Sequence, residues 1–219
     1  MSNPRRIGSD VDEPWMRTIG NYSLKWGDVP SSVAPYVPTP IDVVKKMLKV
    51  AGAGPNDVVY DLGCGDGRIL FTAVEEFGVR KAVGFDLNFI MCQSVQERVN
   101  MKSLNDRIEV VNGNFFMADL SQATLVTIYL TTSGNTKLKP KFEKELRSGS
   151  RVVSHDFPIH GWTTLKHDDP IYFDYGSHKV YLYRVPEAYE IQDKIIRTSD
   201  EESRWKRIRD AFLRHENRS

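Results

Sequence analysis

A short apolar run that leads directly into a glycine-rich turn constrains the fold of this chain more than any other feature. Residues 58–62 are mostly β-branched or aromatic, as in a strand that is buried on both faces. Gly63, Gly65 and Gly67 follow at alternate positions, and apolar residues recur at helical spacing from Ile69 onward. The glycines permit positive φ angles, and a helix N-terminus adds unpaired N–H groups. The segment therefore predicts a strand, a tight turn and a helix that together form a ligand site.

The acidic residues around this turn indicate what binds there. The spacing is Gly-x-Gly-x-Gly, whereas a dinucleotide-binding turn needs a glycine where Arg68 stands. Asp61 and Asp66 flank the turn, where they would repel a pyrophosphate and attract an ammonium group. Asp86 ends the next predicted strand, residues 82–86, at the separation where a carboxylate usually holds ribose hydroxyls. A ribose joined to a cationic amino acid describes S-adenosylmethionine.

Two motifs carry a resemblance to a known family. Asp-Leu-Gly-Cys-Gly-Asp-Gly-Arg (61–68) resembles the first motif of class I, seven-strand methyltransferases, and Phe-Asp-Leu-Asn (85–88) resembles their second motif. A generic α/β nucleotide fold with a chance glycine loop is the alternative, and the presence of both motifs at the right separation disfavours it. The resemblance implies an α/β fold with a doubly wound, mostly parallel, Rossmann-like seven-strand sheet.

The remaining elements fit one such domain with extensions. Residues 171–173 and 180–183 flank a turn and predict a C-terminal antiparallel hairpin. We expect a partly mobile N-terminal extension over residues 1–30, a methyltransferase domain over 31–188, and a charged C-terminal helix over 189–219. The other strands are predicted at residues 82–86, 108–111, 125–130 and 151–155. Two of the helices are predicted at residues 88–100 and 138–146.

Composition limits the partners and the compartment. The net charge of +1 gives no global signal for nucleic acid. No stretch approaches the ~20 apolar residues of a membrane helix, and the N-terminus lacks the apolar core of a signal peptide. The two cysteines, Cys64 and Cys92, suit a reducing compartment. We expect a cytoplasmic protein that does not bind membranes, and the sequence leaves its oligomeric state open.

The resemblance also implies roles for individual residues in cofactor binding. The glycines make room for the methionine part, the acids at the turn engage its ammonium group, and the acid of the second motif binds the ribose. Asn114 stands where the family usually has an acid that accepts from the adenine amine, and Phe115 can cover the ring. For Phe115 and Leu87, ordinary core packing is an equally good interpretation. The full predicted cofactor set is Thr39, Asp61, Gly63, Gly65, Asp66, Gly67, Asp86, Leu87, Asn88, Asn114 and Phe115.

No metal site is predicted. No group of Cys and His residues has zinc spacing, and His155, His160 and His167 resemble loop residues. His155 could orient a water molecule or a substrate carbonyl, whereas a His-Asp pair at a strand end more often closes the loop.

Two observations bear on the identity of the methyl acceptor: motifs that the chain lacks, and a second family resemblance. Residues 129–135 contain no Asn/Asp-Pro-Pro-aromatic turn of the kind used on base amines, and no cysteine nucleophile for pyrimidines. Residues 35–39, 126–142 and 154–162 are similar to the archaeal and mitochondrial seven-strand lysine methyltransferases, distant relatives of the histone lysine methyltransferases without a SET domain. Thr124 departs from that branch, which tends to have an acid there.

This resemblance implies a protein-lysine methyltransferase whose partner is a protein substrate that carries the target lysine. Tyr36 and Tyr129 would line the lysine channel, although Tyr36 could equally be an anchor packed against prolines. Thr39 is also expected to cap the helix that follows it. An RNA or small-molecule methyltransferase on the same fold remains an alternative, as does a non-catalytic S-adenosylmethionine-binding protein.

Overall fold

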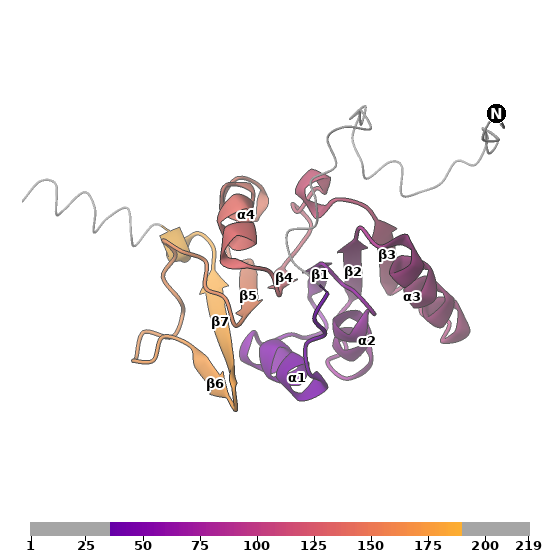
Figure 1. Ribbon diagram of the computed structural model, residues 1–219, viewed down its shortest axis with the longest axis horizontal. Helices are drawn as coiled ribbons and strands as arrows, with labels where there is room; N and C mark the ends of the chain where they lie inside the picture. Colours follow the sequence, from indigo (N-terminus) through magenta and orange to yellow (C-terminus); the bar gives the residue numbers. More distant parts are fainter. Residues whose placement is uncertain (1–35, 190–219) are drawn as a thin grey trace, which may run out of the picture.

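The computed structural model describes residues 36–189, which form one seven-strand sheet with helices on both faces (Figure 1). The strand order is β3-β2-β1-β4-β5-β7-β6. The strands are β1 (Val58–Leu62), β2 (Lys81–Asp86), β3 (Ile108–Asn112), β4 (Leu125–Ile128), β5 (Arg151–His155), β6 (Phe173–Tyr175) and β7 (His178–Arg184). The predicted N-terminal extension and C-terminal helix lie outside the described residues, apart from Tyr189.

The pairing of the strands confirms the predicted doubly wound topology. Strands β1 to β5 pair parallel with one another, whereas β7 pairs antiparallel with both β5 and β6. The last two strands therefore form the terminal hairpin that the sequence predicts. Because β1 lies between β2 and β4, its carboxyl end faces the point where the strand order reverses, which is where doubly wound sheets bind ligands.

The helices form two layers around the sheet (Figure 1). They are α1 (Ile41–Val50), α2 (Arg68–Glu75), α3 (Phe89–Met101) and α4 (Thr132–Glu145), with the short 3₁₀-helix η2 (Phe115–Met117). Val59 of β1 packs in the core with α1, α2 and α3, whereas Tyr60 and Leu62 pack in the core with α4. Both faces of β1 are therefore buried, in agreement with its continuous apolar sequence. Among the described helices, none has the length and apolar character needed to cross a membrane.

Two helix starts differ from the sequence prediction. Helix α4 begins at Thr132 instead of residue 138, and the side chain of Thr131 caps it by accepting from the N–H of Gly134 at 3.3 Å. The early start is hidden in the sequence because Gly134 and Pro140 are poor helix formers. Pro40 is the N-cap of α1, and no side chain caps this helix, so the capping role predicted for Thr39 is wrong.

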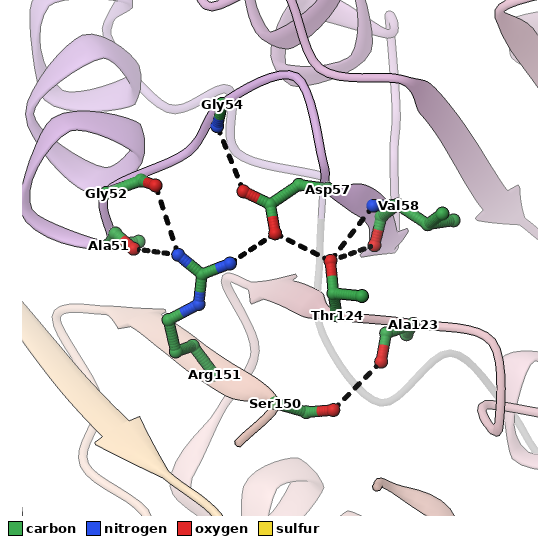
Figure 2. A network of polar contacts seen from close by, with 9 residues as sticks. All are labelled: Ala51, Gly52, Gly54, Asp57, Val58, Ala123, Thr124, Ser150 and Arg151. Carbon is green, nitrogen blue, oxygen red and sulfur yellow. Dashed lines mark hydrogen bonds and ion pairs between the residues drawn. The ribbon is translucent and has the colours of Figure 1, made fainter. Parts of the chain in front are cut away.

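A network of polar contacts joins the amino ends of β1, β4 and β5 (Figure 2). Asp57 is buried and forms an ion pair with Arg151, and it accepts from the Thr124 hydroxyl at 2.7 Å. Thr124 in turn accepts from the N–H of Val58 at 2.9 Å, and Arg151 donates to two carbonyls at the end of α1. Thr124 stands where the similar lysine methyltransferases tend to have an acid. Here it forms structural hydrogen bonds at the amino ends of the strands, away from their carboxyl ends.

The Asp57 network gives a stability prediction. Asp57→Ala leaves the largely buried guanidinium of Arg151 without its counter-charge, so the free energy of unfolding is expected to fall by about 3 kcal/mol. Urea denaturation followed by circular dichroism measures this change. Asp106→Ala, which replaces an exposed aspartate in the turn before β3, is the control and is expected to change stability by less than about 0.5 kcal/mol. Equal stability of the two variants would contradict the assigned role of Asp57.

Candidate functional site

A cavity of about 420 Å³ lies at the carboxyl ends of β1, β2 and β4. Its wall contains both tyrosines predicted for catalysis and every residue predicted for cofactor binding except Gly67. The lining comes from the segment before α1, the glycine turn, and the residues that follow β2, β3 and β4. These segments are far apart in the sequence, and the parallel sheet brings them to one edge.

The glycine turn is fixed against β2 by three hydrogen bonds from backbone N–H groups. The N–H groups of Gly63 and Cys64 both donate to the carbonyl of Phe85 at 2.9 Å, and the N–H of Gly65 donates to Asp86 Oδ2 at 2.9 Å. Gly65 has a φ of +52°, and a Cβ there would lie 2.6 Å from the ring of Tyr36. Glycine is required at this position both by the backbone and by the close approach of the tyrosine.

Gly67, which is predicted to face the cofactor, lies at a contact between two helices. It is the N-cap of α2 with a φ of +75°, and a Cβ there would lie 2.7 Å from the Val95 side chain in α3. Gly67 therefore allows α3 to pack closely against the start of α2, and it is not part of the cavity wall. The alternating glycines of the sequence therefore meet two needs: Gly65 lines the cavity, and Gly67 allows two helices to pack closely.

The two acids of the turn lie in different electrostatic environments. Asp66 forms an ion pair with Arg68 at 2.5 Å, and the hydrogen bonds from this guanidinium hold the pKa of the Asp66 carboxyl below its usual value against the effect of burial. Arg68 also donates to the carbonyl of Thr39 at 2.8 Å, which ties the segment before α1 to the turn. Because the charge of Asp66 is already paired, Asp61 is the better candidate of the two acids for the predicted ammonium contact.

Asp61 is the carboxylate best suited to an ammonium ligand. It is 3% exposed at the end of β1, accepts from the Thr127 hydroxyl at 2.7 Å, and forms no ion pair within residues 36–189. Burial raises the pKa of Asp61 to about 7; the Thr127 hydrogen bond opposes this shift, and the charges of Asp86 and Asp66 add to it. A buried carboxylate of this kind gains its charge readily only when a cation binds next to it.

The second acidic motif both supports the turn and faces the cavity. Asp86 accepts from the N–H of Gly65 through Oδ2 and from the N–H of Asn88 through Oδ1, at 2.9 and 2.8 Å. Each carboxylate oxygen can accept a further hydrogen bond, so the predicted contact with ribose hydroxyls is compatible with these bonds. Asn88 itself caps α3, where its side chain accepts from the N–H of Met91 at 3.2 Å.

The residues predicted to surround the adenine have mixed environments. Asn114 lines the cavity, but the oxygen expected to accept from the adenine amine already accepts from the N–H of Phe116 at 3.0 Å. Phe115 is buried in the core, which confirms the packing interpretation, and it also contributes to the wall, so its contact with the adenine stays a prediction. Leu87 is 41% exposed and lines the cavity, which is against the core-packing interpretation.

The two tyrosines line the cavity in different surroundings. Tyr129 follows β4, the centre of its ring lies 3.9 Å from that of His155, and its hydroxyl lies 3.5 Å from Asp156 Oδ2. Burial raises the pKa of Tyr129, and the charge of Asp156 raises it further, so the phenol stays protonated. Tyr36 is 54% exposed and covers Gly65, which is not the environment of a buried anchor.

His155 lies at the end of the strand predicted over residues 151–155, so its grouping with the loop histidines His160 and His167 is wrong. It is the last residue of β5, is fully buried, and lies with Nδ1 3.1 Å from Thr39 Oγ1. The Thr39 hydroxyl therefore contacts this imidazole instead of capping α1. Burial lowers the pKa of His155 to about 4, against the raising effect of Asp156, so the imidazole is neutral at physiological pH.

Several residues of the site were not foreseen from the sequence. Arg68, Met91 and Phe116 line the cavity, and only Arg68 had a sequence signal, as the residue that replaces the third glycine of a dinucleotide turn. His178, on β7, contacts both His155 and Asp156. Local spacing gives no signal for this contact, because the partners lie on different strands.

Comparisons with known proteins agree with the geometry. Residues 61–166 match the family described as the ANTKMT methyltransferase domain. The chain is 47% identical over 156 residues to a protein-lysine N-methyltransferase of Saccharolobus islandicus, with 70% of this chain and 94% of that protein covered. It is 30% identical over 128 residues to the adenine nucleotide translocase lysine N-methyltransferase of Mus musculus, which covers 58% of this chain and 55% of that protein.

A solved structure gives the same fold with a ligand. The crystal structure of an RNA methyltransferase from Salinibacter ruber in complex with S-adenosyl-L-homocysteine aligns with a TM-score of 0.64 and 37% identity, over 69% of this chain and 95% of that chain. The sheet, the glycine turn and the acids at its carboxyl edge define a class I S-adenosylmethionine-dependent methyltransferase. Within that class, the chain belongs to the protein-lysine N-methyltransferase family that includes the Saccharolobus protein.

The raised pKa of Asp61 predicts how cofactor affinity depends on pH. The ammonium group of the ligand needs the ionised carboxylate, so affinity is expected to fall as the pH decreases below about 7, by up to tenfold per pH unit, and to level off above it. Titration calorimetry with S-adenosylhomocysteine, which carries the same ammonium group, between pH 5.5 and 8.5 measures this. Asp61→Asn is expected to bind roughly 10- to 100-fold more weakly at pH 8 and to lose the dependence. The same pH profile in both proteins would contradict the assignment.

Proposed function

We propose that this methyltransferase acts on the side-chain amine of lysine in protein substrates, and that the lysine enters the cavity between Tyr36 and Tyr129. The observation that carries the proposal is that both tyrosines line the same cavity as the residues predicted to hold the cofactor. Two curated relatives that are named for lysine N-methylation support the choice of acceptor.

The residues present fit S-adenosylmethionine. Asp61 offers a buried carboxylate that has no cationic partner within residues 36–189, and Asp86 offers a partly buried carboxylate one strand away. Gly65 has no side chain to occupy the space between them, and the exposed ring of Tyr36 covers its backbone. When bound, the cofactor supplies a methyl group on a sulfonium, and its leaving group departs neutral, so no general acid is needed. The task of the protein is to hold the acceptor in line and close to contact.

The acceptor amine must be uncharged before it can attack. A lysine amine has an ordinary pKa of about 10.4, and both burial and an adjacent positive charge lower it. The Tyr129 hydroxyl can donate its proton toward Asp156, which leaves its lone pairs free to accept from the amine. His155 is poorly suited to serve as the base, because burial lowers its pKa to about 4 and it is not among the residues that line the cavity. Turnover should therefore rise with pH through the neutral range, as the unprotonated fraction of the lysine increases.

RNA methylation is the second candidate, because the Salinibacter structure is described as an RNA methyltransferase. The cavity wall favours a protein acceptor. Arg68 is the one basic residue among the described lining residues, and it is already paired with Asp66. Among the exposed lining residues, Tyr36, Val37 and Leu87 are aromatic or apolar, and Asn88 is polar but uncharged. Binding of RNA depends on basic contacts to phosphate, and within residues 36–189 the lining offers no unpaired basic residue for them.

The compartment that we propose is the cytoplasm. Both cysteines, Cys64 and Cys92, are unpaired and buried, in keeping with a reducing environment.

A labelling experiment separates the two acceptors. The enzyme is incubated with methyl-labelled S-adenosylmethionine and a cell extract, and the products are digested with protease or with nuclease. We expect protease-sensitive label, and mass spectrometry is expected to place the methyl groups on lysine side chains. Nuclease-sensitive label, or methyl groups on glutamate or arginine, would refute the lysine proposal.

Tyr129→Phe tests the role of the hydroxyl directly. The variant keeps the ring and removes the acceptor for the amine, so turnover is expected to fall by about tenfold, equivalent to one hydrogen bond. The affinity for S-adenosylhomocysteine should remain unchanged, because the hydroxyl faces the acceptor side. Tyr175→Phe, on the exposed β6 strand, is the matched control and is expected to retain full turnover. A Tyr129→Phe enzyme with unchanged turnover would remove this residue from the mechanism.

A further inference from the structure

Three polar side-chain atoms converge behind the wall of the cavity. They belong to His155 at the end of β5, to Asp156, which follows it, and to His178 at the start of β7. His155 Nε2 lies 2.9 Å from His178 Nδ1 and 3.2 Å from Asp156 Oδ2, and His178 Nδ1 lies 3.0 Å from the same oxygen. Each atom is therefore within hydrogen-bonding distance of the other two. His155 is fully buried, and the other two residues are partly buried.

Hydrogen bonds alone cannot satisfy this triangle. An imidazole nitrogen either donates or accepts, and an ionised carboxylate oxygen only accepts. If both nitrogens carry a proton, two donors face each other at 2.9 Å across the His155–His178 contact. If only one nitrogen carries a proton, the other faces the Asp156 oxygen as a second acceptor. One of the three contacts is therefore unfavourable in every protonation arrangement, whereas a cation between the three atoms would accept a lone pair from each.

We infer that His155, Asp156 and His178 bind one divalent transition-metal ion of the zinc type. Two imidazoles and one carboxylate are a common ligand set for such ions, and they leave one or more coordination positions open. Ligand atoms at ~2.0–2.2 Å from an ion are roughly 2.8–3.1 Å apart in octahedral geometry and roughly 3.3–3.6 Å apart in tetrahedral geometry. The three contacts, at 2.9, 3.0 and 3.2 Å, are close to these separations.

The surrounding groups form hydrogen bonds to the three side chains, as the groups that orient the ligands do in metal sites. Thr39 Oγ1 lies 3.1 Å from His155 Nδ1, the nitrogen that does not face the cluster. Asp156 accepts from the N–H of Lys179 through Oδ1 at 2.8 Å, which leaves Oδ2 to face the histidines. Asp156 also has a φ of +58°, a left-handed conformation that few non-glycine residues adopt. Both arrangements fix the direction of the donor atoms.

The bound ion would lie one side chain away from the acceptor side of the cavity. Tyr129 packs on the His155 ring and reaches Asp156 with its hydroxyl, and Thr39 both contacts His155 and lines the cavity. We assign the ion a positioning role for this wall and no part in the transfer of the methyl group. Its binding depends on the cluster itself and not on which acceptor the enzyme methylates.

Metal binding by the tag-free full chain tests the inference. The protein is stripped with a chelator, dialysed, and titrated with Zn²⁺ in a calorimeter, and Co²⁺ absorption reports the ligand geometry. We expect one site per chain. His178→Gln and Asp156→Asn should each weaken Zn²⁺ binding by at least about 100-fold, and Thr39→Val by about 10- to 100-fold through loss of the contact with His155.

A matched control excludes adventitious binding by surface histidines. His160 is exposed and lies outside the cluster, so His160→Gln should bind Zn²⁺ as the parent protein does. Circular dichroism and the thermal midpoint show whether each variant is folded. If His178→Gln does not fold, the Asp156→Asn variant still tests the inference. The inference is overturned if the parent binds no stoichiometric ion, if binding persists in folded cluster variants, or if His160→Gln loses it equally.

Discussion

The close approach of the glycine turn to β2 is the interaction on which the rest of the site depends. The carbonyl of Phe85 accepts from two successive N–H groups of the turn, and Asp86 accepts from a third. These bonds require Gly84 in the middle of β2, since a Cβ there would lie 2.8 Å from Cys64 Sγ and 2.6 Å from Leu70 Cδ1. One residue without a side chain thus lets β1, the turn and α2 settle against the neighbouring strand, and it places both acidic motifs at one edge.

At that edge, the carboxyl groups of Asp66 and Asp61 differ in their pKa: that of Asp66 is lowered and that of Asp61 is raised. Asp66 is neutralised by a guanidinium in its own turn, so its charge serves to fix Arg68 and, through Arg68, the segment before α1. Asp61 has no such partner within the described chain, and burial makes its ionisation costly until a cation arrives. Asp66 therefore helps to fix the shape of the site, and the unpaired carboxyl of Asp61 is the feature on which the predicted contact with an ammonium group rests.

The sequence predicted the parts of this site that are encoded locally. The strand, the turn and the acid that ends the next strand can be read from spacing because each is contiguous, and the sheet order follows from the alternation of strands and helices. Side-chain partners could not be read in this way. The Asn88 and Asn114 oxygens cap helices, which a motif position does not reveal, and Thr39 bonds to a histidine 116 residues away instead of its own helix. The convergence of His155 with His178 depends on β5–β7 pairing, which is set by the whole sheet.

The two edges of the sheet divide stability and function between them. At the amino edge, Asp57, Thr124 and Arg151 satisfy one another, so this end contributes stability without serving a ligand. At the carboxyl edge, Asp61 is buried without a counter-charge in the described chain, Asp156 adopts a left-handed backbone, and the His155 cluster cannot satisfy its own hydrogen bonds. Each of these features is unfavourable for folding alone. A cation bound beside Asp61 or beside the His155 cluster would offset the electrostatic cost at that place, whereas the backbone of Asp156 is held by the contacts around it. Unfavourable local features of this kind persist where the surrounding structure compensates for them, and in proteins they gather at functional sites. The carboxyl edge is therefore the part of the molecule whose energetics are completed by its ligands.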